Sequence, residues 1–290
     1  MNRLKELQQI ILRVIKSLKL VSIGNNSYRV KGLYLGRFPV SDDSEDYLNF
    51  FYHLALECKK GAFIDVGTNT GQTLYKVLSI DENREYVGFE PQIDSCFFLN
   101  EFIKENELKA HRVFPVGLSN QTEITKLYRR MGYVDTSASV VEGFRPQDFY
   151  RTEQLVYLTT GDKILNQLGL HDISAVKIDV EGGELEVVEG MKKVLSEHKP
   201  FIFFEVLNNF IKITGQSLDP KILEFRQERV RKLENLLRCL NYQVVNLSHD
   251  GNLKEMPSLE ESIADKDSSE NYLAIHQDYT RALFDRVGNS

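Results

Sequence analysis

Apolar residues follow two alternating patterns from residue 61 onward. Short runs of consecutive apolar residues predict buried strands, whereas longer segments with an apolar residue at every third or fourth position predict helices. The first five elements are AFIDVG, QTLYKVLS, EYVGFEP, IDSCFFLNEFIKEN and HRVFPVGLS, alternately strand and helix. Strands separated by helices of this length form a mostly parallel sheet that is covered by helices on both faces.

The alternation breaks between residues 121 and 160. This stretch holds a strand-like run, TEITKLYRR, and a polar loop, MGYVDTSASVVEGF, and we interpret it as an insertion over the sheet. The alternation then resumes with GDKILNQLGL (helix), AVKIDVEG (strand), ELEVVEGMKKVLSEH (helix), PFIFFEVLN (strand), a helix at 220–240, and the strands YQVVNLS and NYLAIHQ. The pattern therefore predicts an α/β fold with seven strands in the sheet.

The first 20 residues have a helical pattern of their own. Basic side chains alternate with an apolar stripe at helical spacing, which predicts an amphipathic helix with the stripe Leu4, Leu7, Ile11, Val14 and Leu18. We expect this stripe to pack on the rest of the domain or on a second copy of the chain in a homo-oligomer. The alternative is peripheral contact with an anionic membrane surface.

Two further elements precede the larger domain. Residues 27–39 alternate polar and apolar side chains, as in a short hairpin. Residues 41–58 predict a helix that is capped by serine and aspartate side chains at its start. We therefore predict an N-terminal extension of helix and hairpin over residues 1–60, followed by one domain over residues 61–290 that carries the insertion.

Composition narrows the classes of function. Acidic residues outnumber basic ones by 42 to 36 and no basic tract marks a nucleic-acid interface, so we expect no nucleic-acid partner. The three cysteines lie far apart without a C-x-x-C pair, which argues against disulfides and structural zinc and favours a cytoplasmic location. No apolar run reaches the roughly 18 residues of a membrane span, and the N-terminus lacks a signal-peptide pattern.

Ligands of such sheets bind at the carboxyl ends of the strands. The first strand is followed by a glycine-rich loop, DVGTNTGQ, which can turn sharply and leads into a helix with free N–H groups. Asn69 stands where the dinucleotide fingerprint has its second glycine, which argues against NAD or flavin. Glu90 follows the second strand and can accept hydrogen bonds from both ribose hydroxyls; the alternative is a solvated acidic turn before a helix.

Five segments together resemble the FkbM-type methyltransferases: DVGTNTG, GFEP, VGLSN, KIDVEGGELEVVEGM, and the strand that ends at Glu205. The resemblance covers roughly residues 60–277, and the KIDVEGGE run is its most specific part. It implies a Rossmann-like, seven-stranded, mostly parallel sheet with helices on both faces. It also implies methyl transfer with S-adenosyl-L-methionine as cofactor.

The resemblance further implies roles for residues at the strand ends. Backbone amides of the glycine-rich loop would receive the amino-acid carboxylate of the cofactor, and an aspartate at the start of the loop would receive its amine. Glu90 would hold the ribose, and the VGLSN segment would contact the adenine. The set implied in this way is Asp65, Gly67, Asn69, Gly71, Glu90, Ser119 and Asn120.

Methyl transfer to a hydroxyl requires alignment of the reactants and removal of the hydroxyl proton. Asp179 and Glu205 end adjacent predicted strands, so either can act as the catalytic base, and Glu181 follows at the same strand end. Two alternatives stay open for these three carboxylates. They could hold a divalent cation, although we predict no metal, or they could be structural.

The acidic residues beyond this strand have a simpler interpretation. Glu184 begins a helix and can cap it. Glu186 and Glu189 are interpreted as exposed helix residues, with Glu189 forming an ion pair with Lys193.

We therefore predict a methyltransferase that acts on a hydroxyl of a sugar, glycan or other small molecule. Acceptor choice would come from the 121–160 insertion and the first 60 residues, with Tyr133, Ser137 and Ser139 as candidate contacts. The alternatives are a non-catalytic cofactor- or nucleotide-binding scaffold of the same fold and an NAD-dependent oxidoreductase.

Overall fold

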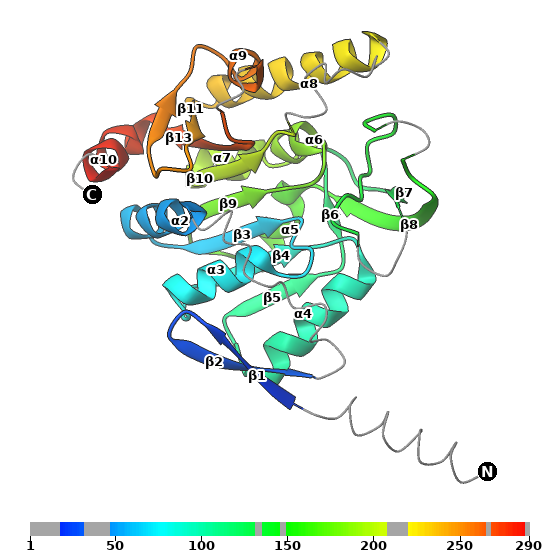
Figure 1. The fold of residues 1–290 in the computed structure, drawn as a ribbon, viewed down its shortest axis with the longest axis vertical. Coiled ribbons are helices and arrows are strands. Elements are labelled where there is room, and N and C mark those ends of the chain that lie inside the picture. Colours follow the sequence, from blue (N-terminus) through cyan, green and yellow to red (C-terminus); the bar gives the residue numbers. More distant parts are fainter. Residues whose placement is uncertain are drawn as a thin grey trace.

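A mixed eight-stranded sheet forms the centre of the protein (Figure 1). The computed structural model describes residues 18–31, 47–130, 135–145, 149–207, 220–264 and 268–287. The strands of this sheet are β3 (Ala62–Val66), β4 (Tyr86–Phe89), β5 (His111–Phe114), β9 (Ile173–Ile178), β10 (Phe201–Glu205), β11 (Tyr242–Leu247), β12 (Leu253–Glu255) and β13 (Asn271–His276). Their order is β12-β11-β13-β10-β9-β3-β4-β5, and the five strands from β10 to β5 are parallel.

All seven predicted strands are present, so the predicted α/β class is confirmed. The sheet is less uniformly parallel than expected, because β13 runs antiparallel to β10 and β11, and β12 adds a three-residue edge strand. With β12 set aside, the chain order across the sheet is 3-2-1-4-5-7-6, so the winding direction reverses between β3 and β9. Ligands of doubly wound sheets bind at such a reversal.

Helices cover both faces of the sheet, as the sequence predicts. One face carries α2 (Tyr47–Cys58), α3 (Gln72–Ile80), α4 (Ile93–Glu105) and α10 (Gln277–Val287). The other carries α5 (Gly161–Leu168), α6 (Glu184–Glu189), α7 (Lys192–His198), α8 (Pro220–Cys239) and α9 (Leu259–Ala264). Successive strand residues point to opposite faces, so Phe63 and Ile64 pack into different buried clusters. Each face therefore has its own hydrophobic core.

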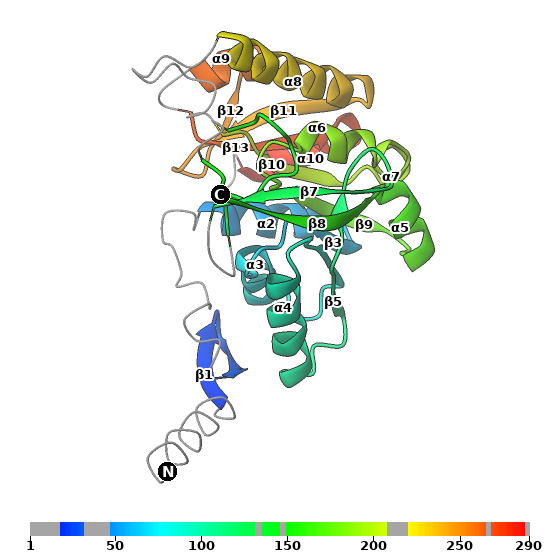
Figure 2. The ribbon, with the colours of Figure 1, turned by 90° about the vertical axis from the view of Figure 1, so that its right-hand side faces the viewer.

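A second, three-stranded sheet lies on the side to which the parallel strands point (Figures 1 and 2). It consists of β6 (Gly117–Leu118), β7 (Glu123–Arg129) and β8 (Thr152–Thr159) in the order β6-β8-β7. The strand-like run predicted in the 121–160 stretch corresponds to β7, whereas β8 was not predicted. This sheet buries Leu127, Val156 and Leu158 on one side and exposes Ile124 and Leu155 on the other.

The N-terminal region differs from the sequence prediction. The structure has an antiparallel hairpin of β1 (Leu18–Ile23) and β2 (Asn26–Lys31). The predicted helix, which we extended to residue 20, therefore overlaps the first strand, and the hairpin begins at residue 18 instead of residue 27. Both predicted boundaries are wrong. Its tight turn at Gly24, which has a φ of 55°, fixes the register. The rest of the predicted helix (1–17), the remainder of the predicted hairpin and the cap of the following helix (32–46) lie outside the described residues.

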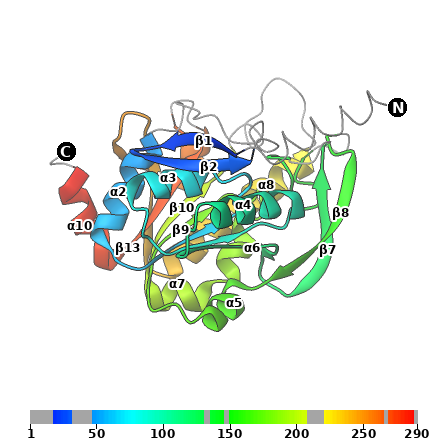
Figure 3. The same cartoon turned by 90° about the horizontal axis from the view of Figure 1, so that it is seen from below.

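The hairpin packs against α3 and α4, beside which it lies in Figure 3. The Tyr28 and Phe102 rings are 5.8 Å apart, and Lys31 forms ion pairs with Glu101 and Glu105. The predicted helix before the first strand is confirmed as α2, which packs on the sheet through Phe51 and other buried residues. In the part of the chain that the structure describes, no helix is long and apolar enough to cross a membrane.

The end of α6 touches the base of the second sheet without any intervening side chain. A Cβ atom added at Gly190 would lie 2.0 Å from the Ser119 carbonyl oxygen, although the Gly190 backbone itself is helical. The Gly190 carbonyl also accepts a hydrogen bond from the Asp162 N–H at 2.9 Å. A glycine is therefore required at this position for steric reasons alone.

We expect Gly190→Ala to lower the free energy of unfolding by roughly 2 kcal/mol or more, because a buried backbone contact must separate. Gly169→Ala is the matched control: Gly169 has a φ of 62° with nothing within 4 Å of an added Cβ, so only backbone strain of about 1 kcal/mol is expected. Urea unfolding of both variants measures the difference. Equal losses would contradict the close contact.

Candidate functional site

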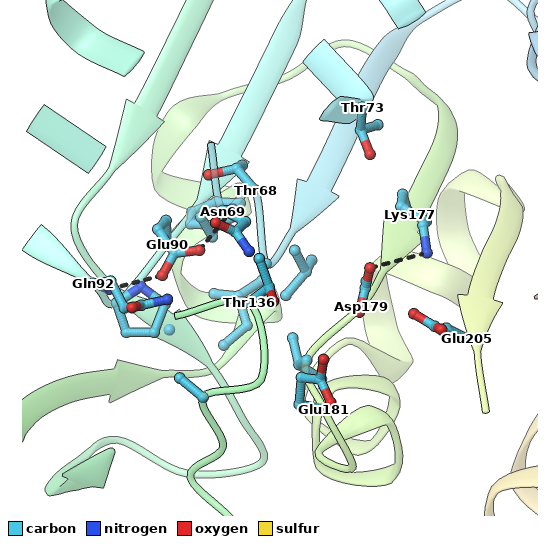
Figure 4. A pocket seen from close by; sticks show the side chains of 18 of the residues that line it. Thr68, Asn69, Thr73, Glu90, Gln92, Thr136, Lys177, Asp179, Glu181 and Glu205 are labelled. Atoms are coloured by element: carbon cyan, nitrogen blue, oxygen red, sulfur yellow. Dashed lines mark hydrogen bonds and ion pairs between the residues drawn. The ribbon is translucent and has the colours of Figure 1, made fainter. Parts of the chain in front are cut away.

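A cavity of about 250 Å³ opens at the winding reversal between β3 and β9. Its walls come from the carboxyl ends of β3, β4, β9 and β10, from the starts of α2 and α3, and from the second sheet with residues 135–140. Figure 4 shows polar side chains from these elements around the space. Of the predicted site residues, the structure brings together Gly67, Asn69, Glu90, Asp179, Glu181 and Glu205.

The glycine-rich loop lies directly against the end of β9. Gly67 has a φ of 88°, and an added Cβ would lie 1.9 Å from the Asp179 carbonyl oxygen. The Gly67 N–H donates to the Phe89 carbonyl and the Asp179 N–H donates to the Val66 carbonyl, each at 2.9 Å. These contacts hold the ends of β3, β4 and β9 together.

The same loop presents polar atoms to the cavity. Asn69 has a left-handed backbone with a φ of 47°, which is rare outside glycine and asparagine. The Thr68 hydroxyl and the Asn69 side-chain oxygen are buried and have no hydrogen-bond partner among the described residues. Both residues line the cavity. Since buried polar atoms are normally paired, this wall is suited to a polar ligand.

Gly71 lies beyond the cavity wall. It has a φ of 99° and precedes the first turn of α3. An added Cβ would lie 2.6 Å from a Leu99 methyl carbon, so this glycine allows α3 and α4 to approach each other. The structure therefore places Gly71 as a residue that shapes the loop rather than one that lines the space.

Glu90 holds the other side of the loop in place. One carboxylate oxygen accepts from the Asn69 N–H and the other from the Gln92 N–H, both at 2.8 Å. Burial raises the pKa of Glu90 to about 7, against the effect of these hydrogen bonds. The Gln92 side chain also hydrogen-bonds to this carboxylate, and the lone-pair positions that remain can accept hydrogen bonds from a ligand.

Asp65 lies beneath the loop, outside the cavity wall. It is fully buried, and one oxygen accepts a hydrogen bond from the Tyr86 hydroxyl. Burial raises the pKa of Asp65 to about 7. Direct contact with a ligand amine, as the resemblance implies, would require its second oxygen, which has no hydrogen-bond partner among the described residues.

Asp179, Glu205 and Lys177 form a group of charged side chains at the ends of β9 and β10 (Figure 4). The Lys177 Nζ lies 3.6 Å from an Asp179 carboxylate oxygen, and the Lys177 side chain is almost completely buried. Burial, the negative charge of Asp179 and a hydrogen bond to it raise the pKa of Glu205, and the Lys177 charge opposes them in part. Two close carboxylates do not both ionise easily, so this environment favours the protonated form of Glu205.

Glu181 is already engaged by residues of the segment that connects β7 and β8. Its carboxylate forms an ion pair with the buried Arg145 guanidinium, and its carbonyl accepts a hydrogen bond from the Ser139 hydroxyl at 2.8 Å. Burial, followed by the charge of Asp179, raises the pKa of Glu181 to about 8. The residue has a φ of 55°, so these contacts hold a strained turn directly after Asp179.

Ser119 and Asn120 line a neighbouring cavity of about 310 Å³, next to the first. Leu118 and Leu158 belong to the walls of both cavities. The Asn120 side-chain amide donates to the Glu189 carboxylate at 2.8 Å. The structure does not place Ser119 and Asn120 on the wall shared by the other predicted site residues.

The acidic residues of α6 are more engaged than expected. Glu184 accepts from the N–H of Gly182, which precedes the N-cap residue Gly183, at 3.0 Å, so it closes the turn before the helix, and the predicted side-chain cap of the helix is not present. Glu186 and Glu189 are half-buried, and Glu186 forms an ion pair with Arg229 of α8. The prediction that both are simply exposed is therefore wrong, because α8 and the second sheet pack over this helix. We expected Lys193 to pair with Glu189, but its Nζ lies 3.9 Å from a carboxylate oxygen of Glu197 instead.

Of the three candidate acceptor contacts, Tyr133 lies outside the described residues. Ser137 donates its hydroxyl proton to Asp135 at 2.6 Å, and Ser139 donates to Glu181. Neither serine is among the residues that line the first cavity.

Sequence reasoning assigned no site role to several polar residues of the cavity wall, among them Thr68, Lys177 and Gln92. Lys177 has a signal in the sequence, since a lysine inside an otherwise apolar strand run must be paired when it is buried. Gln92 has no such signal, because its contacts are with a segment that follows it by more than 40 residues. Among the described residues, no group of three or more His, Cys, Asp or Glu side chains is arranged to hold a metal ion.

Comparison with known proteins identifies a domain. The family model described as "Methyltransferase FkbM domain" matches residues 65–244, more than half of the chain. No curated protein matches the chain.

Several solved structures are similar at low identity. One is a methyltransferase FkbM from Methylobacillus flagellatus KT, with 16% identity and a TM-score of 0.41 over 75% of this chain and 44% of that one, so the chain spans less than half of its length. An O-methyltransferase from Bacillus cereus in complex with SAH has 12% identity and a TM-score of 0.46, over 83% of this chain and 86% of that one. A precorrin-6y C5,15-methyltransferase from Geobacter metallireducens GS-15 has 10% identity and a TM-score of 0.40, with 83% and 93% coverage. At this level of similarity, these structures assign no ligand, substrate or residue role to the chain.

We expect Glu205→Gln to stabilise the ligand-free protein in a pH-dependent way. The pKa of Glu205 in the folded protein is raised above its ordinary value of about 4.3 in the unfolded chain. At a pH between these two pKa values, the folded protein holds a proton that the unfolded chain has released. Stability is then lost as pH rises, and glutamine, which keeps the shape and a donor, removes this loss. Urea unfolding should give equal stabilities at about pH 4 and a gain of at least about 1 kcal/mol at about pH 8.

The exposed Glu255→Gln is the control and should change neither value. A Glu205→Gln gain that is the same at both pH values would contradict a buried, protonated carboxyl group.

Proposed function

The chain belongs to the methyltransferase FkbM domain family, a family whose cofactor is S-adenosyl-L-methionine, and on that premise we propose that it methylates a hydroxyl of a sugar, glycan or other small molecule. The observation that carries the proposal is the pair of neighbouring carboxyl groups, Asp179 and Glu205, which line the same cavity as Glu90 and the glycine-rich loop. When bound, S-adenosyl-L-methionine supplies a methyl group on a positively charged sulfur.

The residues of the cavity fit this cofactor better than a dinucleotide. Five carboxyl groups line the cavity, and burial raises the pKa of three of them, Glu90, Glu181 and Glu205. A cation reduces the electrostatic cost of ionising such groups, whereas a diphosphate would increase it. This charge distribution argues against the NAD-dependent alternative.

We propose that Glu90 binds the ribose through its free lone pairs and that the Thr68 hydroxyl and the Asn69 side-chain oxygen bind the amino-acid end. Both of these latter atoms are buried and have no hydrogen-bond partner among the described residues, as expected for groups that a ligand satisfies. Asp65 contributes less directly, from beneath the loop. Ser119 and Asn120 would contact the adenine only if it reached the neighbouring cavity.

We propose that Asp179 takes the proton of the acceptor hydroxyl. Asp179 lies next to Glu205 at the cavity wall, and burial together with the Asp179 charge raises the pKa of Glu205 and favours its protonated form. The Lys177 ammonium group, 3.6 Å away, stabilises that charge. Glu181 is paired with Arg145, so we assign it a positioning role at the turn instead of the catalytic role that its place in the sequence suggests.

The remaining sequence predictions extend this proposal. We propose that the 121–160 stretch of the 61–290 domain selects the acceptor, since its strands and the residues between them form one wall of the cavity. A cytoplasmic location is supported by Cys58, Cys96 and Cys239, all of which are free thiols. Homo-oligomerisation or membrane contact through residues 1–20 remains a proposal from the amphipathic pattern alone.

We expect Glu90→Ala to weaken binding of S-adenosylhomocysteine by about 100-fold or more, because two hydrogen bonds to a charged acceptor are lost. Asp179→Asn should leave this affinity within about threefold and lower turnover by roughly 10² to 10⁴-fold, the usual contribution of a positioned base. Calorimetric titration gives the affinity, and release of S-adenosylhomocysteine with a panel of sugars and hydroxylated small molecules gives the turnover.

Asp250→Asn, at an exposed turn, is the control for the second variant and should match the wild type. Full turnover in Asp179→Asn would rule out the proposed base. A wild type that binds S-adenosylhomocysteine but methylates none of the panel would favour the non-catalytic scaffold.

A further inference from the structure

Gln92 joins two parts of the site that are far apart in the chain. Its side-chain Nε2 donates to the Asp135 carbonyl at 2.9 Å, and its Oε1 accepts from the Asp135 N–H at 3.1 Å. Both residues are buried, with exposed fractions of 4% for Gln92 and 7% for Asp135. A primary amide that pairs with both backbone groups of one residue reproduces the contact between neighbouring strands, so it fixes orientation as well as distance.

On one side, Gln92 is connected to the proposed cofactor site. Its own backbone N–H donates to Glu90, and the second oxygen of Glu90 accepts from the Asn69 N–H, both at 2.8 Å (Figure 4). A continuous series of hydrogen bonds therefore runs from the glycine-rich loop through Glu90 and Gln92 to Asp135.

On the other side, Asp135 begins a segment that forms a wall of the cavity through Thr136, Ala138 and Val140. The Asp135 carboxylate accepts from the Ser137 N–H at 2.9 Å and from the Ser137 hydroxyl at 2.6 Å, which closes the turn at the start of the segment. We call residues 135–140 the wall segment.

The wall segment is fixed again near its other end. Ser139 exchanges two backbone hydrogen bonds with Tyr128 of β7, at 2.8 and 3.1 Å, and its hydroxyl donates to the Glu181 carbonyl. The wall segment therefore reaches from Gln92, which contacts Asp135, to Glu181, which contacts Ser139. Its position sets the width of the space between the cofactor side and the proposed base.

We propose that Gln92 is a positioning residue that links the proposed cofactor site to the wall segment, so that cofactor binding at Glu90 fixes the wall against which the acceptor is placed. The proposal rests on the proposed function, because it takes Glu90 as a cofactor ligand. A ligand held by Glu90 restrains the Glu90–Gln92 backbone and thereby the side chain that holds Asp135. Binding at one site and order in the other are then reciprocal.

Hydrogen exchange tests this link without knowledge of the acceptor. In the wild type, saturating S-adenosylhomocysteine should slow hydrogen exchange of the wall-segment amides by about tenfold or more. A factor of this size corresponds to the net stabilisation by one to two neutral hydrogen bonds. In Gln92→Leu the same ligand should change these rates by less than about twofold. The backbone N–H of residue 92 still donates to Glu90, although the side-chain hydrogen bond from Gln92 to Glu90 is lost, so the affinity for S-adenosylhomocysteine should fall by no more than about tenfold.

Gln154→Leu is the matched control. The Gln154 side chain accepts from Arg129 at 2.9 Å within the second sheet and is not among the residues that line the cavity, so its loss should leave the ligand effect on the wall segment unchanged. Gln92→Met keeps the length of the side chain but lacks both the donor to the Asp135 carbonyl and the acceptor for the Asp135 N–H. It serves as the second variant if Gln92→Leu does not fold, and the ligand effect on the wall segment should again be lost.

Three results would overturn the link. Bound S-adenosylhomocysteine could leave hydrogen exchange of the wall segment unchanged in the wild type, or slow it in a Gln92 variant as much as in the wild type. The third is that Gln154→Leu abolishes the ligand effect as completely as the Gln92 variants do. Failure of the wild type to bind S-adenosylhomocysteine at all would be a different result. It would reject the proposed cofactor site, and the link with it, before any exchange rate was compared.

Discussion

The geometry of the site depends on the close approach of the ends of β3 and β9. Gly67 lies so near the Asp179 carbonyl that an added Cβ would be 1.9 Å from it, and the adjoining backbone hydrogen bonds at Val66 and Phe89 are 2.9 Å long. This contact places the glycine-rich loop and the candidate base on one rigid framework. A polar ligand held by the loop would therefore lie beside Asp179.

Burial gives this framework its electrostatic character. The pKa is raised to about 7 for Asp65, Glu90 and Glu184, to about 8 for Glu181, and further for Glu205, with burial as the largest cause in each case. Ionised carboxylates without bound ligand destabilise such a region. A cationic ligand lowers this cost, and the nearby Lys177 and Arg145 lower it in part without one. The same groups that weaken the empty site therefore favour a positively charged cofactor.

Much of this could be predicted from the sequence, for physical reasons. Buried parallel strands read as apolar runs, and Gly67, Asn69 and Glu90 follow such runs directly, so local pattern was enough to bring them together. The pairing of Gln92 with Asp135 and of Glu181 with Arg145 was not predictable, because each joins segments that meet only in the folded chain. The strand β8 was missed for a different reason: the apolar residues Leu155 and Tyr157 lie on its exposed face, which obscures the alternation of polar and apolar residues.

A crystal structure of the protein with S-adenosylhomocysteine tests the central claim most directly. The account predicts electron density in the cavity at the winding reversal, with the ribose hydroxyls on the Glu90 carboxylate and the sulfur on the side of Asp179 and Glu205. Ligand bound wholly in the neighbouring cavity beside Ser119 and Asn120, or away from Glu90 altogether, would contradict it.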